Sequence, residues 1–504
     1  MFCRIHSAAI FGVDAVPVAV EADASSGLPM FSIVGFVSSQ VREAQDRVRT
    51  ALRSYEVNLP PKRLTINLAP GDLRKDGTRF DLPIAAAVLG AIGEIDPAVF
   101  ADTMVLGELR LDGAVERITG ILPSVLCARQ MGCTSCIVPA GNRIEAGIVD
   151  GIRVIGLRDI GELIAYARDG VIPEAEEIRA AAAGDSGKEL PDFADIHGQA
   201  SMKRAAVIAA AGFHNLLISG PPGAGKSMAA QRIPTILPPL GADEQLEISK
   251  LYSIAGLLPA DRPLLCERPF RAPHHSLTPT ALCGGGRVPR PGEVTLAHRG
   301  VLFLDEIAEM KRETIDLMRQ PLEDHHVTIS RIGGTFDFPA GFLLVAAMNP
   351  CPCGFFPDRS RCQCSMAEIS LYRRRISHAF MDRIDLHCEV QAVSYQDLTQ
   401  SSSHEEGSAA LREKVCGAAR VQSERYRGMG IHFNSELSAA DMQKYCRMTE
   451  DGSRMLHRAF ETLGLSARGY HHILRVARTI ADLDSSDVIS EAHISEAIIC
   501  RNGD

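Results

Sequence analysis

The chain has 504 residues, of which 46% are hydrophobic and 23% are charged, so it exceeds the size that one hydrophobic core usually supports and two or three domains are expected. Its formal net charge of -9 excludes a broadly basic nucleic-acid-binding coat, but not local basic loops that line a channel. No uninterrupted apolar stretch reaches the ~18 residues of a membrane span, and the first residues lack the pattern of a signal peptide. We therefore expect a cytoplasmic protein without membrane contact, whose 14 cysteines are reduced thiols or metal ligands.

Residues 1–170 are predicted to form a first α/β domain, because short β-like runs alternate with helix-like runs. The predicted strands include residues 16–20, 64–68 and 103–106, and the predicted helices include residues 39–55 and 82–92. Residues 171–191 are predicted to be a linker, because most of this stretch is rich in Glu, Ala and Gly and poor in large apolar residues.

A glycine-rich loop with the spacing G-x-x-x-x-G-K-S follows the apolar run 216–218, which suits a buried parallel strand. In such a loop the backbone N–H groups surround a triphosphate, the lysine reaches the β- and γ-phosphates, and the serine hydroxyl ligates Mg²⁺. The alternative is a Gly/Pro-rich turn that fits the pattern by chance. The predicted nucleotide-binding residues, with Ser227 also a Mg²⁺ ligand, are Gly220, Pro221, Pro222, Gly223, Ala224, Gly225, Lys226 and Ser227.

Polar side chains follow two further predicted strands. Asp305 and Glu306 come directly after the apolar run 301–304, at the strand end where ligands sit in an open α/β sheet. Asp305 is expected to hold Mg²⁺ through water, and Glu306 to orient and polarise the attacking water, although such a pair can also cap a helix start. Asn349 ends the run 342–348 and is predicted to position the same water, unless it is only a turn residue.

Four cysteines follow Asn349 as two C-x-C pairs, in a loop rich in Gly, Pro, Asp and Arg. Four thiolates at short spacing suit tetrahedral Zn²⁺, which would stabilise a loop with too few apolar residues to fold by itself. Because C-x-C is less common than C-x-x-C at zinc sites, free or redox-active thiols remain the alternative. The predicted structural zinc site consists of Cys351, Cys353, Cys362 and Cys364.

The phosphate loop, the Asp-Glu strand and the Asn-tipped strand, in this order, resemble the AAA+ ATPases, which implies ATP as the nucleotide. Residues 268–275 and 292–300 are similar to the magnesium-chelatase group of these ATPases. The resemblance implies an AAA+ core with a phosphate loop over residues 192–393. It also implies an insertion over about 266–291, before the Asp-Glu strand, and a hairpin over 326–338, before the Asn-tipped strand.

By the same resemblance, two arginines complete the ATPase site. Arg383 is similar to an arginine finger, which would reach the ATP of a neighbouring subunit and stabilise transition-state charge. Arg468, in a carboxy-terminal helical lid over residues 394–504, resembles the lid arginine that contacts the γ-phosphate. A local salt bridge for Arg383 and an exposed helix start for Arg468 are the alternatives. A finger that acts on the next subunit implies a ring, expected to be a homo-hexamer as in the family.

Two stretches of the first domain resemble the proteolytic domain of Lon, which implies a ribosomal-protein-S5-domain-2-like fold. They read K-D-G-T-R-F-D-L-P from Lys75 and G-E-L-R-L-D-G from Gly107. Lon's nucleophilic serine is replaced here by Arg79, and the position of its lysine falls near Leu122, so protease chemistry is expected to be absent. Thr78 is a substitute nucleophile without an evident lysine partner, and a structural or partner-binding domain is preferred.

A Lon-like domain fused to a chelatase-type motor identifies the chain as a member of the ComM/YifB family, over essentially its whole length. This resemblance implies a hexameric, ATP-dependent DNA motor for branch migration in recombination during natural transformation. Its expected partners are single-stranded, double-stranded and branched DNA, bound without sequence specificity, and a recombination protein. A magnesium-chelatase motor acting on a porphyrin and a protein-remodelling ATPase are the alternatives, and the fused Lon-like domain and the cysteine loop argue against the chelatase.

The expected DNA contacts lie in the insertion and the hairpin, which in ring motors face the channel. Basic and hydrogen-bonding groups there track phosphates without reading bases. Ordinary surface or zinc-adjacent residues are the alternative for the histidine pairs. The candidates are Arg271, His274, His275, His325, His326 and Arg331.

Overall fold

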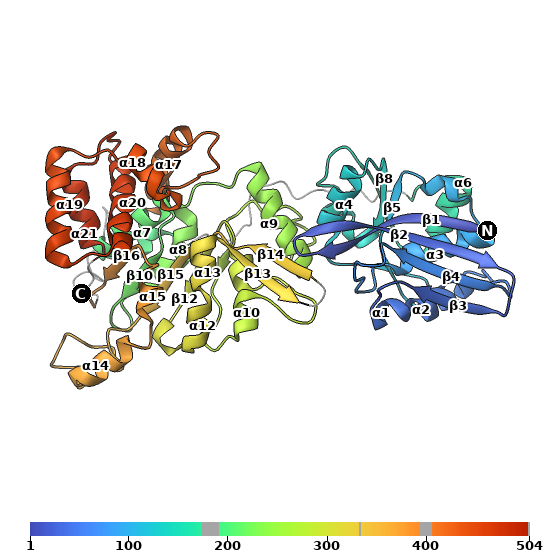
Figure 1. Ribbon diagram of the computed structural model, residues 1–504, viewed down its shortest axis with the longest axis horizontal. Coiled ribbons are helices and arrows are strands. Elements are labelled where there is room, and N and C mark those ends of the chain that lie inside the picture. Colours follow the sequence, from blue (N-terminus) through green and yellow to red (C-terminus); the bar gives the residue numbers. More distant parts are fainter. Residues whose placement is uncertain (174–190, 332–333, 393–405, 502–504) are drawn as a thin grey trace.

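The computed structural model describes residues 1–173, 191–331, 334–392 and 406–501. Two sheet-containing parts and a helical part follow one another along the long axis, with the two termini toward opposite ends (Figure 1). Most of the predicted linker over 171–191 and the start of the predicted lid lie outside the described residues. Within those described ranges, none of the helices combines the length and the apolar character that crossing a bilayer requires.

The amino-terminal part is built on a mixed sheet in which β1 and β2 form a long antiparallel hairpin, with Phe2 opposite Asp23 and Phe11 opposite Asp14. Its strands in sheet order are β3 (Met30–Val34), β4 (Arg63–Ala69), β2 (Asp14–Ser25), β1 (Phe2–Phe11), β5 (Thr103–Val105), β8 (Ser135–Pro139) and β9 (Arg153–Leu157). A second, small sheet pairs β6 (Glu108–Leu109) with β7 (Val115–Glu116). The predicted strands of this part are confirmed.

Alternate residues of this sheet belong to two separate hydrophobic cores. On β5, Val105 packs in one core and Met104 in the other, because successive side chains of a strand point to opposite faces. The first core contains α3, which is buried on nearly all sides, and the second contains α4. The helices are α1 (Ser39–Arg42), α2 (Ala44–Ser54), α3 (Asp81–Ile92), α4 (Ile121–Gln130), α5 (Arg143–Ala146) and α6 (Ile160–Asp169). The predicted helix over 39–55 is thus broken in two at Glu43.

The central part contains a parallel sheet, and its predicted strands are confirmed as β10, β12 and β15. In sheet order the strands are β11 (Phe270–Arg271), β12 (Val301–Leu304), β15 (Leu343–Met348), β10 (Leu216–Ser219) and β16 (Leu386–Glu389). All side chains of β12 and β15 are buried, which explains their uninterrupted apolar sequences. The surrounding helices are α7 (Ala200–Gly212), α8 (Lys226–Ile236), α9 (Ala242–Ala255), α10 (Pro279–Cys283), α11 (Glu293–Leu296), α12 (Arg312–Leu317), α13 (Arg319–Asp324), α14 (Met366–Arg373) and α15 (His378–Met381).

The predicted hairpin is confirmed as β13 (His326–Arg331) paired with β14 (Gly334–Pro339), and it points toward the amino-terminal part (Figure 1). The ring of Phe336 on this hairpin lies 4.4 Å from the ring of Phe11, at the end of β1. Beside it, Lys250 on α9 forms an ion pair of 2.6 Å with Asp14. The hairpin is therefore packed against the amino-terminal sheet.

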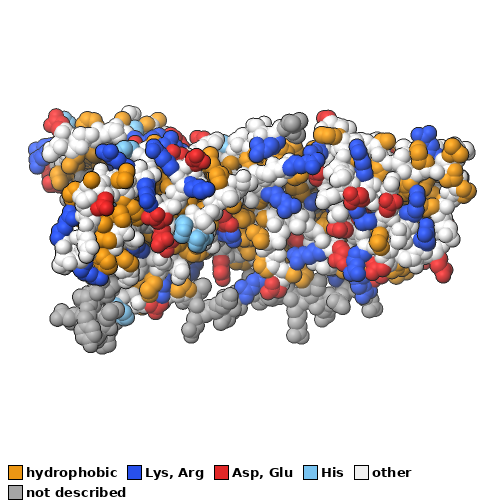
Figure 2. All heavy atoms as spheres, turned by 90° about the horizontal axis from the view of Figure 1, so that it is seen from below, with side chains coloured by type: hydrophobic (Ala, Val, Ile, Leu, Met, Phe, Trp, Pro, Cys, Tyr) orange, Lys and Arg blue, Asp and Glu red, His pale blue; other side chains and the backbone are white. Residues whose placement is uncertain are grey.

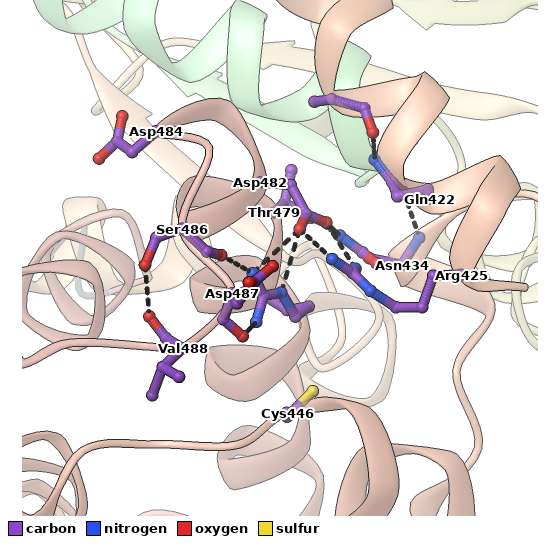
Figure 3. A network of polar contacts seen from close by, with 12 residues as sticks. Gln422, Arg425, Asn434, Cys446, Thr479, Asp482, Asp484, Ser486, Asp487 and Val488 are labelled. Atoms are coloured by element: carbon purple, nitrogen blue, oxygen red, sulfur yellow. Dashed lines mark hydrogen bonds and ion pairs between the residues drawn. The ribbon is translucent and has the colours of Figure 1, made fainter.

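The carboxy-terminal part consists of helices whose hydrophobic core is continuous with one face of the central sheet. They are α17 (Ser408–Arg425), α18 (Ala439–Tyr445), α19 (Glu450–Leu463), α20 (Ala467–Leu483) and α21 (Glu491–Ile499). Figure 3 shows a polar network inside this part, centred on Asp482. The Asp482 carboxylate is 2% exposed and accepts hydrogen bonds from Arg425, Arg478 and Asn434.

Replacing Asp482 with alanine is expected to destabilise the helical part by about 3–5 kcal/mol, because the guanidinium of Arg478, only 1% exposed, would lose its carboxylate partner inside the protein. Asp484→Ala is the matched control: that side chain is 50% exposed, so its loss should cost about 1 kcal/mol or less. Urea denaturation followed by circular dichroism measures both, and equal midpoints for the two variants would contradict a stabilising role of the network.

Candidate functional site

The predicted phosphate loop connects β10 to α8 at the carboxyl edge of the central sheet. Gly223 and Gly225 adopt φ values of 79° and 85°, in the left-handed region that favours glycine. This conformation ends at Lys226, the first residue of α8, so the N–H groups of the loop and the helix start are available to an anion. The loop can therefore bind phosphate groups.

Lys226 is held by oxygen atoms at the centre of this loop. Its Nζ donates to the carbonyls of Gly220 (2.6 Å) and Pro221 (3.0 Å) and to Oδ1 of Asn349 (3.1 Å). Burial lowers the pKa of the Lys226 ammonium, and the carboxylates of Asp305 and Glu306 oppose that shift. The structure therefore brings Asn349, from the neighbouring strand, to the lysine that is 123 residues away in sequence.

Ser227 and Asp305 meet on the other side of the lysine. The Ser227 hydroxyl donates to Oδ2 of Asp305 at 2.8 Å, and the N–H of Glu306 donates to Oδ1 of Asp305 at 2.9 Å. A hydroxyl and a carboxylate side by side are the hard oxygen donors that Mg²⁺ prefers. Glu306 has a φ of 49°, and its half-exposed carboxylate is free of the Asp305–Ser227 contact. The donor set fits a nucleoside triphosphate with Mg²⁺.

His275 lies beside this site, a position that the sequence did not predict. Its Nδ1 is 3.5 Å from Oε2 of Glu306, and its ring packs on His274 with centroids 4.1 Å apart. The placement follows from β11, which pairs with β12 as Phe270 with Val301. Because the strands are parallel, residues after β11 reach the same sheet edge as Glu306. Recognition of residues 270–271 as a short edge strand would have been the signal.

The six candidate DNA contacts do not form one surface. Arg271 is engaged with Glu293, with N–O distances of 2.6 and 2.8 Å. His325 lines a hollow at the amino edge of the sheet, whereas Arg331 is on the hairpin and donates to the Gly286 carbonyl at 3.2 Å. His326 is exposed at the start of β13. The structure therefore places these groups at separate positions of one chain, and their role in DNA binding stays a prediction.

Arg383 and Arg468 lie together, away from the phosphate loop. Both contact the carboxylate of Glu323, Arg468 at 2.7 Å. Arg383 precedes β16, whereas the phosphate loop follows β10, and these strands are parallel neighbours. The arginines and the loop are therefore at opposite edges of the sheet, which are separated by roughly 13 Å of strand.

Asp385 explains why the two arginines meet. This buried carboxylate, two residues after Arg383, accepts a hydrogen bond from the N–H of Asn215 at 2.9 Å and contacts Nδ1 of His472, one helical turn after Arg468. Burial alone would raise the pKa of Asp385, but His472 and His214 lower it below its ordinary range. The charged Asp385 thus links the segment that carries Arg383 to α20 through its contact with His472.

The four cysteines converge as the sequence predicted. The Sγ atom of Cys351 lies 3.4 Å from that of Cys353 and 3.8 Å from that of Cys362, and all four Sγ atoms lie within 4.8 Å of one another. A tetrahedral metal with bonds of ~2.3 Å to sulfur requires sulfur–sulfur distances of about 3.8 Å. The N–H of Phe356 also donates to the Cys351 sulfur, as expected for a thiolate ligand. This cluster could hold a metal ion.

The two Lon-like stretches come together in the amino-terminal part. Arg79 is buried and donates to the carbonyl of Thr119 (2.7 Å) and to the hydroxyl of Ser124 (3.3 Å), beside Leu122 on α4. Burial lowers the pKa of Arg79 to about 10. The Thr78 hydroxyl donates to the carboxylate of Glu108. By the resemblance to Lon, Arg79 stands at the position of the nucleophile and Leu122 lies near that of its lysine. Neither side chain can act as nucleophile or base, and the absence of protease chemistry stays a prediction.

Three sequence families cover most of the chain. Residues 192–398 match magnesium chelatase, subunit ChlI; residues 20–142 match subunit ChlI of Mg-chelatase; and residues 405–501 match magnesium chelatase, subunit ChlI C-terminal. These families support an ATPase of the AAA+ class, whose phosphate loop and Asp-Glu strand have the geometry described above.

Individual proteins are similar over nearly the full length. The chain is 40% identical over 498 residues to the competence protein ComM of Haemophilus influenzae, which covers 98% of this chain and 96% of ComM. It is 38% identical over 497 residues to YifB of Salmonella typhimurium, which covers 99% and 96%. Similarity to the Lon protease of Mycolicibacterium smegmatis is partial, with 25% identity over 187 residues, or 35% of this chain and 23% of that protease. The chain therefore belongs to the ComM/YifB family of magnesium-chelatase-like proteins.

Proposed function

We propose that the chain is a cytoplasmic, ATP-driven motor that assembles as a homo-hexameric ring and moves on DNA, where it promotes branch migration of recombining strands during natural transformation. The main observation in support of a ring is the separation of Arg383 and Arg468 from the phosphate loop of the same chain. The similarity to a relative named for competence supports the role in DNA uptake. The absence of Lon's catalytic residues at Arg79 and Leu122 argues against proteolysis.

The residues of one chain supply the binding half of the ATPase site. Bound ATP with Mg²⁺ supplies the phosphoryl group whose transfer to water releases the energy. Lys226 would exchange the Gly220 and Pro221 carbonyls for phosphate oxygens, and Ser227 and Asp305 would hold the metal. Glu306 orients the attacking water, with Asn349 beside it to fix the geometry.

The other half comes from the next subunit. Arg383 and Arg468 point from the amino edge of the sheet, so in a ring they face the carboxyl edge of a neighbour. Two guanidiniums placed on the γ-phosphate stabilise the charge that develops in the transition state, and a single arginine finger contributes about 10³–10⁵ in rate. In a separate chain both guanidiniums contact the single carboxylate of Glu323.

The family match also supports a second candidate, a magnesium-chelatase-type motor that works with partner subunits. The four-cysteine cluster and the Lon-like amino-terminal part argue against a magnesium chelatase. A protein-remodelling ATPase would use the same nucleotide site. All these candidates share the ATPase mechanism and differ in what the ring acts on, so the substrate decides between them.

Mixing two inactive variants tests the shared site. Lys226→Ala and Arg383→Ala should each lower ATPase activity at least about 1000-fold. In an equimolar mixture, about a quarter of the subunit interfaces join an intact loop to an intact arginine, so about a quarter of wild-type activity should return.

A mixture of Lys226→Ala with Glu306→Gln is the matched control. Both changes lie in the loop half of the site, so no interface in that mixture is complete and activity should stay absent. If the Lys226→Ala and Arg383→Ala mixture is equally inactive, the arginine does not act on a neighbouring subunit.

A synthetic four-way junction with ATP tests the action on DNA. The wild-type protein should convert the junction to forked products on a native gel, whereas Lys226→Ala should not, because it cannot bind nucleotide. Glu306→Gln should bind ATP without hydrolysing it and should leave the junction in place. Hydrolysis of ATP by the wild type without any movement of the junction would exclude branch migration.

The metal is tested by its content in the purified protein. We propose that the cluster holds structural zinc, because thiolates select this ion and the loop's small core of Ile369 and the cysteines cannot fold it alone. Elemental analysis should find about one zinc per chain in the wild type and none in the Cys351→Ser, Cys362→Ser double variant. Cys266→Ser, at an exposed cysteine, is the control and should keep the metal. Unchanged metal in the double variant would refute the site.

A further inference from the structure

A groove runs between the amino-terminal part and the central part. A cavity of about 800 Å³ is lined on one side by residues of β1 and the Lon-like stretches, and on the other by the insertion and the hairpin. A smaller cavity of about 490 Å³ lies beside the start of α1. Both cavities are lined by Arg74 and Arg287, so they adjoin, and we refer to them together as the groove.

Arginines dominate the charge of this groove. Within the described residues, Arg42, Arg287 and Arg290 have no carboxylate partner, and Arg331 donates to the carbonyl oxygens of Gly286 and Ser330. Arg74 pairs with Asp76 at 2.7 Å. Figure 2 shows Lys and Arg side chains gathered near this junction. The lining acidic groups are Glu43, Asp76 and Glu108, and the lining arginines are Arg42, Arg74, Arg79, Arg117, Arg287, Arg290 and Arg331.

Aromatic and apolar side chains lie between these charges. Phe36 is 47% exposed and lines the smaller cavity beside Arg42 and Arg74. The Phe11–Phe336 pair lines the larger cavity and joins its two walls. Guanidiniums that bind phosphates, interleaved with rings on which bases stack, are the combination that binds single-stranded nucleic acid without sequence preference.

We propose that this groove binds a segment of single-stranded nucleic acid, with its phosphates on the arginines of both walls and a base stacked on Phe36. The two adjoining cavities favour a strand over a compact anion, because Arg42 lines one cavity, Arg290 lines the other and Arg287 lines both, and these arginines have no carboxylate partner among the described residues. This inference rests on the proposed DNA motor and assigns to the amino-terminal part a direct role as one wall of the strand site. The larger cavity, which is lined by Thr78 and Arg79 of the Lon-like stretches, would thus bind nucleic acid.

Neutralising each wall tests the groove. Arg42→Gln alters the amino-terminal wall and the Arg287→Gln, Arg290→Gln double variant alters the insertion. Fluorescence anisotropy with a labelled oligo(dT) should show about tenfold weaker binding for the double variant and a measurable loss for Arg42→Gln. The slope of log K against log salt should fall by about 0.7 for each phosphate contact that is removed. Circular dichroism verifies that the variants are folded.

The matched control is the Arg427→Gln, Arg458→Gln double variant, which removes two exposed arginines of the helical part and should bind within about twofold of wild type. Phe36→Ala should weaken oligo(dT) about 5- to 150-fold and leave duplex affinity unchanged. Phe2→Ala, at a ring that is 58% exposed, is its control.

The outcomes separate the groove from the motor. If wild type binds oligo(dT) and moves junctions while the groove variants bind equally well, the groove is not the strand site and the motor proposal stands. If Phe36→Ala weakens single strands and duplex alike, the single-strand assignment is wrong. If the wild type binds no form of DNA, the groove and the DNA motor fail together.

Discussion

The direction of the central strands is the constraint on which the site depends. Because β10, β12, β15 and β16 run parallel, every residue that follows a strand gathers at one edge and every residue that precedes a strand gathers at the other. Lys226, Asp305 and Asn349 are therefore neighbours without being close in sequence. The same direction sends Arg383 to the far edge, and no movement of a side chain can bring it back to its own phosphate loop. The composite site between subunits that we propose would use both edges.

A second set of contacts joins the amino-terminal part to the central part. The hairpin β13–β14 belongs to the central part, but its Phe336 packs on Phe11 of the amino-terminal sheet, next to the Lys250–Asp14 ion pair. The Gly120 N–H also donates to the Ser253 carbonyl of α9 at 2.9 Å. A displacement of the hairpin during ATP hydrolysis would therefore also shift the amino-terminal part, because these contacts join the two parts directly.

The parallel core could be read from the sequence because its central strands are buried on both faces and leave apolar runs. The glycine-rich loop follows β10, and the polar residues Asp305 and Asn349 follow β12 and β15. The cysteine cluster was predictable for a similar reason, since all its ligands come from one short loop. The position of His275 was not predictable, because it depends on the two-residue strand β11, which has no periodicity of its own. The meeting of Arg383 and Arg468 at the Glu323 carboxylate also escaped prediction, since it depends on the contact between Asp385 and His472, which are 87 residues apart. Long-range polar contacts of this kind have no local sequence signal.

Glu323 affects the charge at the amino edge of the central sheet, where Arg383 and Arg468 lie. In a separate chain this single carboxylate contacts both arginines and offsets one of their two positive charges. In the proposed ring, the γ-phosphate of a neighbouring subunit's ATP would replace the Glu323 carboxylate as the anion that contacts these arginines. The contact therefore acts as an internal competitor. In the proposed ring, a neighbour whose site is empty would have no γ-phosphate to displace Glu323, so the interface would distinguish subunits with bound ATP from subunits without it.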